Sequence, residues 1–180
     1  INASLVLSYV AMRKDDKAGL VTFNEYFDTF VPASKQVGQM QTLLENLYKQ
    51  ETTFGETDFS ALCGHLGKHV NKRSFLVLYT NFSNMTSLNR QLVYLQQLAR
   101  QHRVLVVFFE DADLKEYIAG KSVTTEDYYR HVIAEKFAFE KRLIVSTLKQ
   151  HGIYSLLTTP DKLSIDVINK YLEMKSRQLL

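Results

Sequence analysis

"SFLVLYT" at residues 74–80 and "RVLVVFFE" at residues 103–110 are near-continuous apolar runs, each bounded by charged or polar residues. Such runs are typical of parallel strands that helices cover on both faces, since neither face is then left polar. Residues 87–102 lie between them and repeat leucine at the spacing of an amphipathic helix. These three segments predict a strand-helix-strand crossover unit.

The chain before this unit contains a helical pattern, a strand pair and a second helix. Residues 1–13 are apolar on nearly every side, which predicts a helix buried between layers. Residues 18–23 and 27–31 are short runs of β-forming residues, which predict a hairpin. Ser34 is placed to cap a helix over residues 35–50.

The remaining elements follow the same alternation of helix and strand. Helical patterns cover residues 59–70 and 124–151, and Gly152 stands where the second of these helices should end. A short strand then leads to a last amphipathic helix that begins at about Leu163. We therefore expect one α/β domain over residues 1–180, a doubly wound, mostly parallel Rossmann-like sheet with an antiparallel edge hairpin.

Composition narrows the function classes. The 22 Lys and Arg residues against 19 Asp and Glu give a net charge of +3, scattered along the chain, which is too weak a field to indicate nucleic-acid binding. Cys63 is the single cysteine, so an internal disulfide is excluded. The longest apolar run near the N-terminus, at residues 5–12, is far shorter than the roughly 20 residues of a membrane-spanning helix.

The helix predicted at residues 59–70 carries two further patterns. Gly64 and Gly67 follow Ala61 at intervals of three, and each glycine costs a helix about 1 kcal/mol relative to alanine, so we expect a close-packed neighbour there. His65 and His69 are four residues apart, a spacing that can hold a metal. The ordinary alternative is a pair of surface or interfacial histidines.

Ligands bind doubly wound sheets at the carboxyl ends of the strands. Two groups of candidate residues fall there or in the loop before residue 59, namely Asn81, Asp111 and Asp113, and Glu56, Thr57 and Asp58. Carboxylates and hydroxyls suit Mg²⁺. The same acidic residues also suit the positive ends of the helices that follow them, and Thr57 and Asp58 are typical of a helix start.

The motifs of several enzyme classes are missing from the chain. GxGxxG, GxxxxGK[ST] and GxSxG do not occur, so the common phosphate-binding loops and the nucleophile elbow are absent. We expect a protein that is not an enzyme. The alternative is a metal-dependent hydrolase or nucleotide-binding enzyme that uses Asp111, Asp113 and Thr57.

Three segments carry a resemblance to a known family: "DKAGLVTF" at 16–23, "GETD" at 55–58 and "INKYL" at 168–172. Over essentially its whole length the chain resembles the bacterial MoxR-associated von Willebrand factor A-like proteins, a family of unknown function. The resemblance implies a Rossmann-like sheet with a metal-ion-dependent adhesion site. In such sites an Asp-x-Ser-x-Ser motif, a threonine and an aspartate surround Mg²⁺, and a partner's carboxylate completes the coordination.

By position, Thr57 matches the threonine of that site, and Asn81 falls where the family has aspartate. Asp-x-Ser-x-Ser is not in the sequence. The chain begins with Ile1 inside a helical pattern, so we expect a fragment whose first, central strand is missing and whose adhesion site is incomplete. We expect weak or no Mg²⁺ binding here, with Mg²⁺ a cofactor of the full-length protein.

The resemblance implies a protein-interaction module that acts with a MoxR-type AAA+ ATPase. It also implies a cytoplasmic location near the membrane, reached through hydrophobic segments before this domain. A purely structural element of a membrane-associated complex is a further alternative, and divalent-cation dependence of partner binding distinguishes the two.

Overall fold

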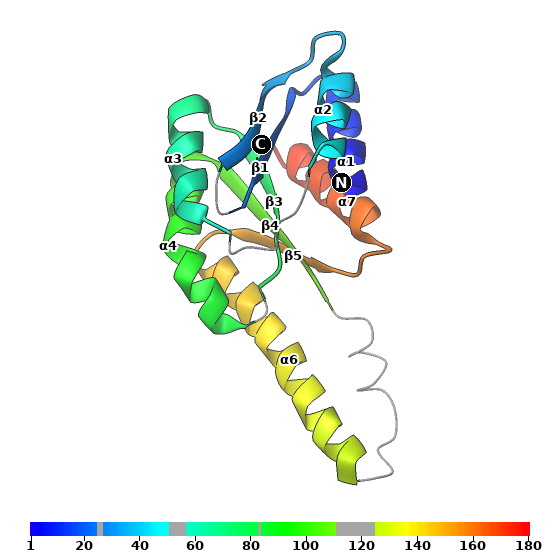
Figure 1. The fold of residues 1–180 in the computed structure, drawn as a ribbon, viewed down its shortest axis with the longest axis vertical. Helices are drawn as coiled ribbons and strands as arrows, with labels where there is room; N and C mark the ends of the chain where they lie inside the picture. Colours follow the sequence, from blue (N-terminus) through cyan, green and yellow to red (C-terminus); the bar gives the residue numbers. More distant parts are fainter. Residues whose placement is uncertain (25–26, 51–56, 83, 111–124) are drawn as a thin grey trace. The chain divides into compact units, whose positions relative to one another are not determined.

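The computed structural model describes residues 1–24, 27–50, 57–82, 84–110 and 125–180 (Figure 1). The chain divides into two compact units. The first comprises Ile1–Lys72 with Leu163–Leu179, and the second comprises Arg73–Lys162 with Leu180. The expectation of a single domain over residues 1–180 stays a prediction.

The first unit is a β-hairpin with four helices. The predicted hairpin is confirmed, since β1 (Ala18–Phe23) and β2 (Phe27–Ser34) pair in antiparallel fashion. Its helices are α1 (Asn2–Arg13), α2 (Gln39–Tyr48), α3 (Phe59–His69) and α7 (Leu163–Ser176). Helix α1 contacts α7, α2 and β1, so the first and last helices of the chain pack together in this unit.

A small apolar core joins the hairpin to α1 and α2. Ala18, Val31 and Leu43 are buried at its centre. The pairing of β1 with β2 shifts between Ala18 and Leu20, at Gly19. A Cβ atom at Gly19 would lie 2.8 Å from Ala33 N and Val31 O, so the backbone of β2 leaves room for glycine alone.

Two predictions about this unit are wrong. Helix α1 is not buried between layers: among its residues only Ala3 is buried, and Val6 and Tyr9 are exposed, because α1 packs through one side only. Ser34 does not cap a helix but ends β2, where its Oγ accepts a hydrogen bond from the Gln36 amide.

The second helix starts later than expected. Gly38 takes a left-handed conformation with φ of 92°, and α2 begins at the next residue, Gln39. The Gln39 side-chain amide donates to Ala18 O at 2.8 Å and to Pro32 O at 3.0 Å. These bonds tie the start of α2 to both strands of the hairpin, a tertiary constraint that local propensity does not reveal.

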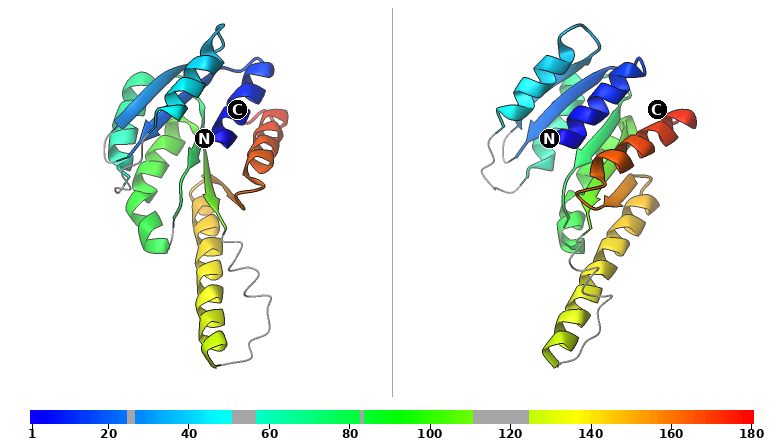
Figure 2. Two further views of the ribbon diagram at one scale, coloured as in Figure 1. Left: turned by 45° about the vertical axis from the view of Figure 1, so that its right-hand side comes forward. Right: turned by 90° about the vertical axis from the view of Figure 1, so that its right-hand side faces the viewer.

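The second unit contains the predicted crossover. Its elements are β3 (Phe75–Tyr79), α4 (Met85–Gln101), β4 (Arg103–Phe109), α6 (Thr125–Gln150) and β5 (Tyr154–Thr158). The three strands are parallel in the order β3-β4-β5. Helix α4 packs on β4 and α6 packs on β5 (Figure 2). Residues 104–108 of the central strand are almost fully buried.

The ends of these helices follow ordinary capping chemistry. Asn84 accepts a hydrogen bond from Ser87 N at 2.9 Å, and the Ser87 hydroxyl pairs with the Asn84 backbone, which completes a capping box. Gly152 has φ of 71°, so the predicted glycine end of α6 is confirmed.

In the described part of the chain, the strands form a two-stranded antiparallel sheet and a three-stranded parallel sheet. The mixed α/β class with a parallel sheet and an antiparallel hairpin is thereby confirmed. The prediction that the hairpin forms an edge of the parallel sheet is wrong, because β1 and β2 pair only with each other among the described strands. The von Willebrand factor A-like assignment and the missing central strand stay predictions.

Candidate functional site

The predicted site residues fall into three places. Glu56, Asp111 and Asp113 lie outside the described residues. Thr57 and Asp58 precede α3 in the first unit, and Asn81 follows β3 in the second. Thr57 and Asn81 thus belong to different units, and a joint site of the two stays a prediction, as does the hydrolase alternative.

Asp58 is the N-cap of α3, which confirms its predicted role at a helix start. Its Oδ1 accepts hydrogen bonds from Ser60 N at 2.7 Å and Ala61 N at 3.0 Å. Its own amide donates to Asn24 O at 2.8 Å, which fixes the entry to the helix. This carboxylate is thus used for capping, while the neighbouring Thr57 is exposed.

Phe59 and Cys63 lie on the buried side of α3. Phe59 is buried and meets Phe23 of β1 edge to face, with ring centroids 5.5 Å apart. Burial and the nearby Asp58 charge raise the pKa of the Cys63 thiol to about 11. The thiol is therefore protonated at neutral pH, which excludes it as an activated nucleophile.

The opposite, outer side of α3 is open. A Cβ atom added at Gly64 or Gly67 would meet nothing within 4 Å, so the predicted close approach at these glycines is wrong for the part of the chain that the structure describes. His65 and His69 stack with ring centroids 5.8 Å apart, and His69 also lies 5.3 Å from the Phe30 ring. These ring contacts suit packing of α3 on β2.

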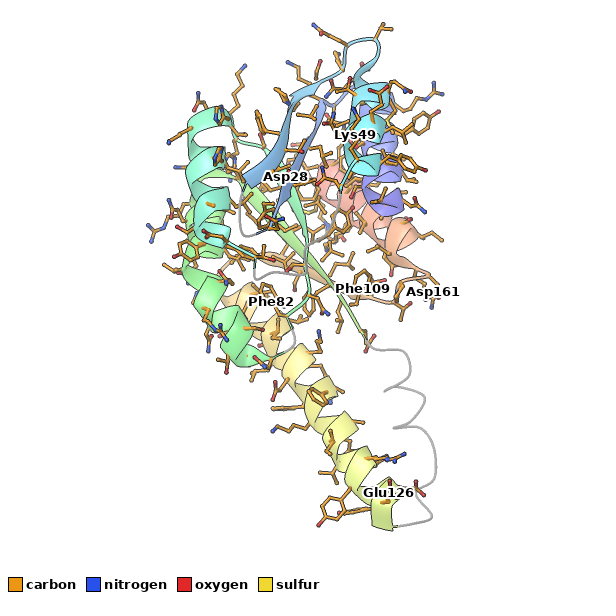
Figure 3. All side chains as sticks on the ribbon, viewed as in Figure 1. Asp28, Lys49, Phe82, Phe109, Glu126 and Asp161 are labelled. Carbon is orange, nitrogen blue, oxygen red and sulfur yellow. The ribbon has the colours of Figure 1, made fainter. Side chains whose placement is uncertain are left out.

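Asn81 lies at the carboxyl end of β3 and already holds a cation. Lys141 of α6 donates from Nζ to Asn81 Oδ1 at 2.9 Å and to the Phe82 carbonyl at 2.6 Å. The same Nζ stands 5.5 Å from the centre of the Phe108 ring, a cation–π distance. Phe82, labelled in Figure 3, and Phe108 are both buried, so the ammonium group lies next to buried aromatic residues.

This arrangement does not fit a divalent cation at Asn81. The asparagine amide is neutral, whereas Mg²⁺ sites rely on carboxylates to offset the charge. An ion with charge +2 placed 4 Å from the Lys141 ammonium would meet a repulsion of about 2 kcal/mol in bulk water and about 8 kcal/mol at an effective dielectric constant of 20. Among the described residues no group of three or more His, Cys, Asp or Glu side chains is positioned to hold a metal.

Lys141 is the site residue that sequence reasoning missed. It is 60 positions from Asn81, so no local motif joins them. A weaker signal was present: Lys141 shares a face of the helix with Ala134, Ile144 and Leu148, all buried. A lysine on the inward face of an amphipathic helix requires a partner for its charge.

A second polar cluster ties α7 to the segment before β1. The Tyr171 hydroxyl donates to Asp16 Oδ2, and Lys175 Nζ donates to the same oxygen at 2.7 Å and to Lys14 O at 2.8 Å. Burial and the Asp16 carboxylate raise the pKa of Tyr171 to about 12. The phenol therefore stays protonated as a donor, and the cluster acts as a structural tether between distant parts of the chain.

Together, these features define an α/β protein with a crossover sheet whose strand-end edge presents an amide and a bound ammonium. The chain belongs to a family of proteins of unknown function, DUF58, whose family model matches residues 1–124. The match includes the hairpin, α3 and the crossover unit, and it ends before α6. No curated protein and no solved structure matched the chain.

No helix in the described ranges has both the length and the apolar character needed to cross a bilayer.

Proposed function

We propose that this chain is a non-enzymatic protein-interaction module that acts with a MoxR-type AAA+ ATPase and recognises its partner without a divalent cation. The observation that carries the proposal is the Lys141 ammonium bound to Asn81 Oδ1 and Phe82 O. It supplies a fixed positive charge at the strand-end edge, where an adhesion site of the related family would hold a metal.

The chemistry of this edge suits recognition better than catalysis. Asn81 and Lys141 are a hydrogen-bond acceptor and its donor, and neither is an activated nucleophile or a base. A positive charge at a strand-end edge favours an acidic partner surface, mainly through the association rate and the choice of partner. The choice of ATPase comes from the resemblance of the sequence to the MoxR-associated proteins.

The test uses the purified 180-residue chain and the purified MoxR-type ATPase of the same genome. Binding is measured by interferometry with nucleotide-free ATPase, once in EDTA and once in Mg²⁺. We expect the two dissociation constants to agree within about twofold, and Lys141→Met to weaken binding by about tenfold, or 1.4 kcal/mol.

Lys149→Met is the matched control, because Lys149 is exposed and belongs to the same helix. Circular dichroism verifies that both variants are folded. Absence of binding by the wild-type protein contradicts the partnership, and binding that disappears in EDTA contradicts the metal-independent mode.

A further inference from the structure

His102 is a buried histidine at the turn between α4 and β4. It keeps 2% of its area exposed, and in the part of the chain that the structure describes Thr158 is the only other buried polar residue. The His102 amide donates to Leu98 O at 2.8 Å, which ends α4, and β4 begins at the next residue, Arg103. The imidazole therefore belongs to the junction between this helix and the central strand of the parallel sheet.

The two ring nitrogens of His102 have different surroundings. Nδ1 accepts a hydrogen bond from the Ser74 amide at 3.3 Å, just before β3 begins. A ring nitrogen that accepts carries no proton, so the neutral imidazole holds its proton on Nε2. Nε2 is buried and has no hydrogen-bond partner among the described residues. A buried donor without an acceptor destabilises the fold, so packing alone does not explain a histidine at this position.

Protonation of the ring is incompatible with this contact. The second proton would go to Nδ1, the atom that accepts from the Ser74 amide. Two N–H groups would then face each other, and the hydrogen bond would be lost. The imidazolium would also bring a positive charge into a site that excludes water, which is costly without an anionic partner. His102 therefore fits this geometry only in its neutral form.

The segments around His102 offer the imidazolium no counter-ion. Parallel strands begin at the same edge of a sheet, so the starts of β3 and β4 and the turn from α6 to β5 meet there. The charged side chains and the other histidine on these segments and on the last turn of α4 are all basic, namely Arg73, Arg100, Arg103, Lys149 and His151. Residues 59–109 and 141–160, which include all of these segments, contain no Asp or Glu. The surroundings thus repel a positive charge on the ring.

We propose that His102 is a pH-sensitive switch in the second unit. In its neutral form the ring joins the start of β3 to the junction of α4 and β4, next to the backbone hydrogen bond from Arg103 N to Ser74 O. In mildly acidic solution the ring takes up a proton and releases the Ser74 amide. The parallel sheet then opens between β3 and β4, beginning at its amino-terminal edge.

The direction of the pH effect follows from the burial of the ring. Burial lowers the pKa of His102 in the folded protein below the usual 6.5. The open form therefore binds the proton more tightly than the closed form. The closed form is fully favoured above pH 6.5 and loses stability as the pH falls toward the lower pKa of the folded state. Within that window the equilibrium constant for opening should rise by up to about tenfold per pH unit.

Amide hydrogen exchange of the 180-residue chain tests where the opening occurs. Exchange is measured at pH 7.5 and pH 5.5 and corrected for the intrinsic effect of pH on the exchange rate. We expect the protection of the β3 amides to fall several-fold, up to about tenfold, at the lower pH, and that of β1 and β2 in the first unit to stay unchanged. Equal protection of β3 at both pH values, or an equal loss in both units, overturns the proposal.

His102→Asn separates the effect of the proton from that of packing. The Asn side-chain oxygen can accept from the Ser74 amide but does not titrate in this pH range. This variant should lose the pH dependence of β3 protection between pH 7.5 and pH 5.5, whatever its overall stability. His151→Asn is the matched control, since His151 is exposed at the same edge of the sheet, and it should keep the pH dependence. A pH dependence that survives His102→Asn contradicts the switch.

Nuclear magnetic resonance of the ring nitrogens gives a second measurement that needs no folded variant. In the wild-type chain at pH 7.5, His102 should carry its proton on Nε2, as the hydrogen bond to Nδ1 requires. The folded protein should gain the second proton only below pH 6.5. A neutral ring with its proton on Nδ1, or a ring that is protonated at or above pH 6.5 while the sheet stays closed, overturns the proposal.

Discussion

Replacing both Gly64 and Gly67 by alanine should stabilise the protein. The two glycines lie inside α3, neither has a positive φ, and a Cβ atom at either one would meet nothing within 4 Å. Only helix propensity then distinguishes the two residue types, and alanine is favoured by about 1 kcal/mol at each position. The double variant should gain about 2 kcal/mol, which corresponds to a rise in Tm of about 4–8 °C for a chain of this size.

The assay is urea unfolding followed by circular dichroism, with thermal unfolding as a second measurement. Gly152→Ala is the matched control, since it also adds one methyl group into open space but at a φ of 71°. Left-handed backbone disfavours alanine by roughly 1–2 kcal/mol, so this variant should lose stability. A loss of stability in Gly64→Ala or Gly67→Ala would refute the reasoning, because it would require a neighbour packed on this face of α3.

Three further predictions concern the cap, the tether and the metal. Asp58→Ala should lower the free energy of unfolding by about 1 kcal/mol in urea titrations, since the α3 amides of Ser60 and Ala61 lose their acceptor. Burial tends to raise the pKa of Asp16, but the hydrogen bonds from Lys175 and Tyr171 outweigh it and hold the pKa below 3.8. The contribution of this tether to the free energy of unfolding is therefore complete above pH 3.8 and is lost as the pH falls through the lower pKa of the folded state. Asp16→Asn should flatten this part of the curve of stability against pH, and an unchanged curve would contradict the assignment. Calorimetric titration of the 180-residue chain with Mg²⁺ should show no sub-millimolar affinity, and a measurable site of that strength would contradict the account of Asn81.

Periodicity predicted the parallel sheet well because burial on both faces leaves an unmistakable pattern. Residues 103–109 are apolar almost throughout because β4 is central and covered on both faces. Predictions from local sequence were weaker for residue types that occur both at helix starts and at strand ends. Ser34 is a good helix cap, yet it ends a strand here, because Gly38 and the bonds of Gln39 set the start of α2.

The candidate site was harder to predict because its chemistry is not local. Asn81 was identified from its place after a strand, but its partner Lys141 comes from a helix 60 residues later. The prediction for the glycines of α3 was wrong for a different reason. Their unfavourable helix propensity was interpreted as a sign of compensating contact, whereas the structure leaves both positions open and the cost uncompensated.

The position of β5 has a practical consequence for the design of shortened versions of this protein. The family match ends at residue 124, but β5 spans Tyr154–Thr158 and covers one side of β4. A chain cut at residue 124 would expose the hydrogen-bonding edge of β4, the most deeply buried strand in the described part of the protein, as a template for pairing with other chains. Such a fragment should precipitate or form fibres, whereas fragments that keep β5 avoid this open edge.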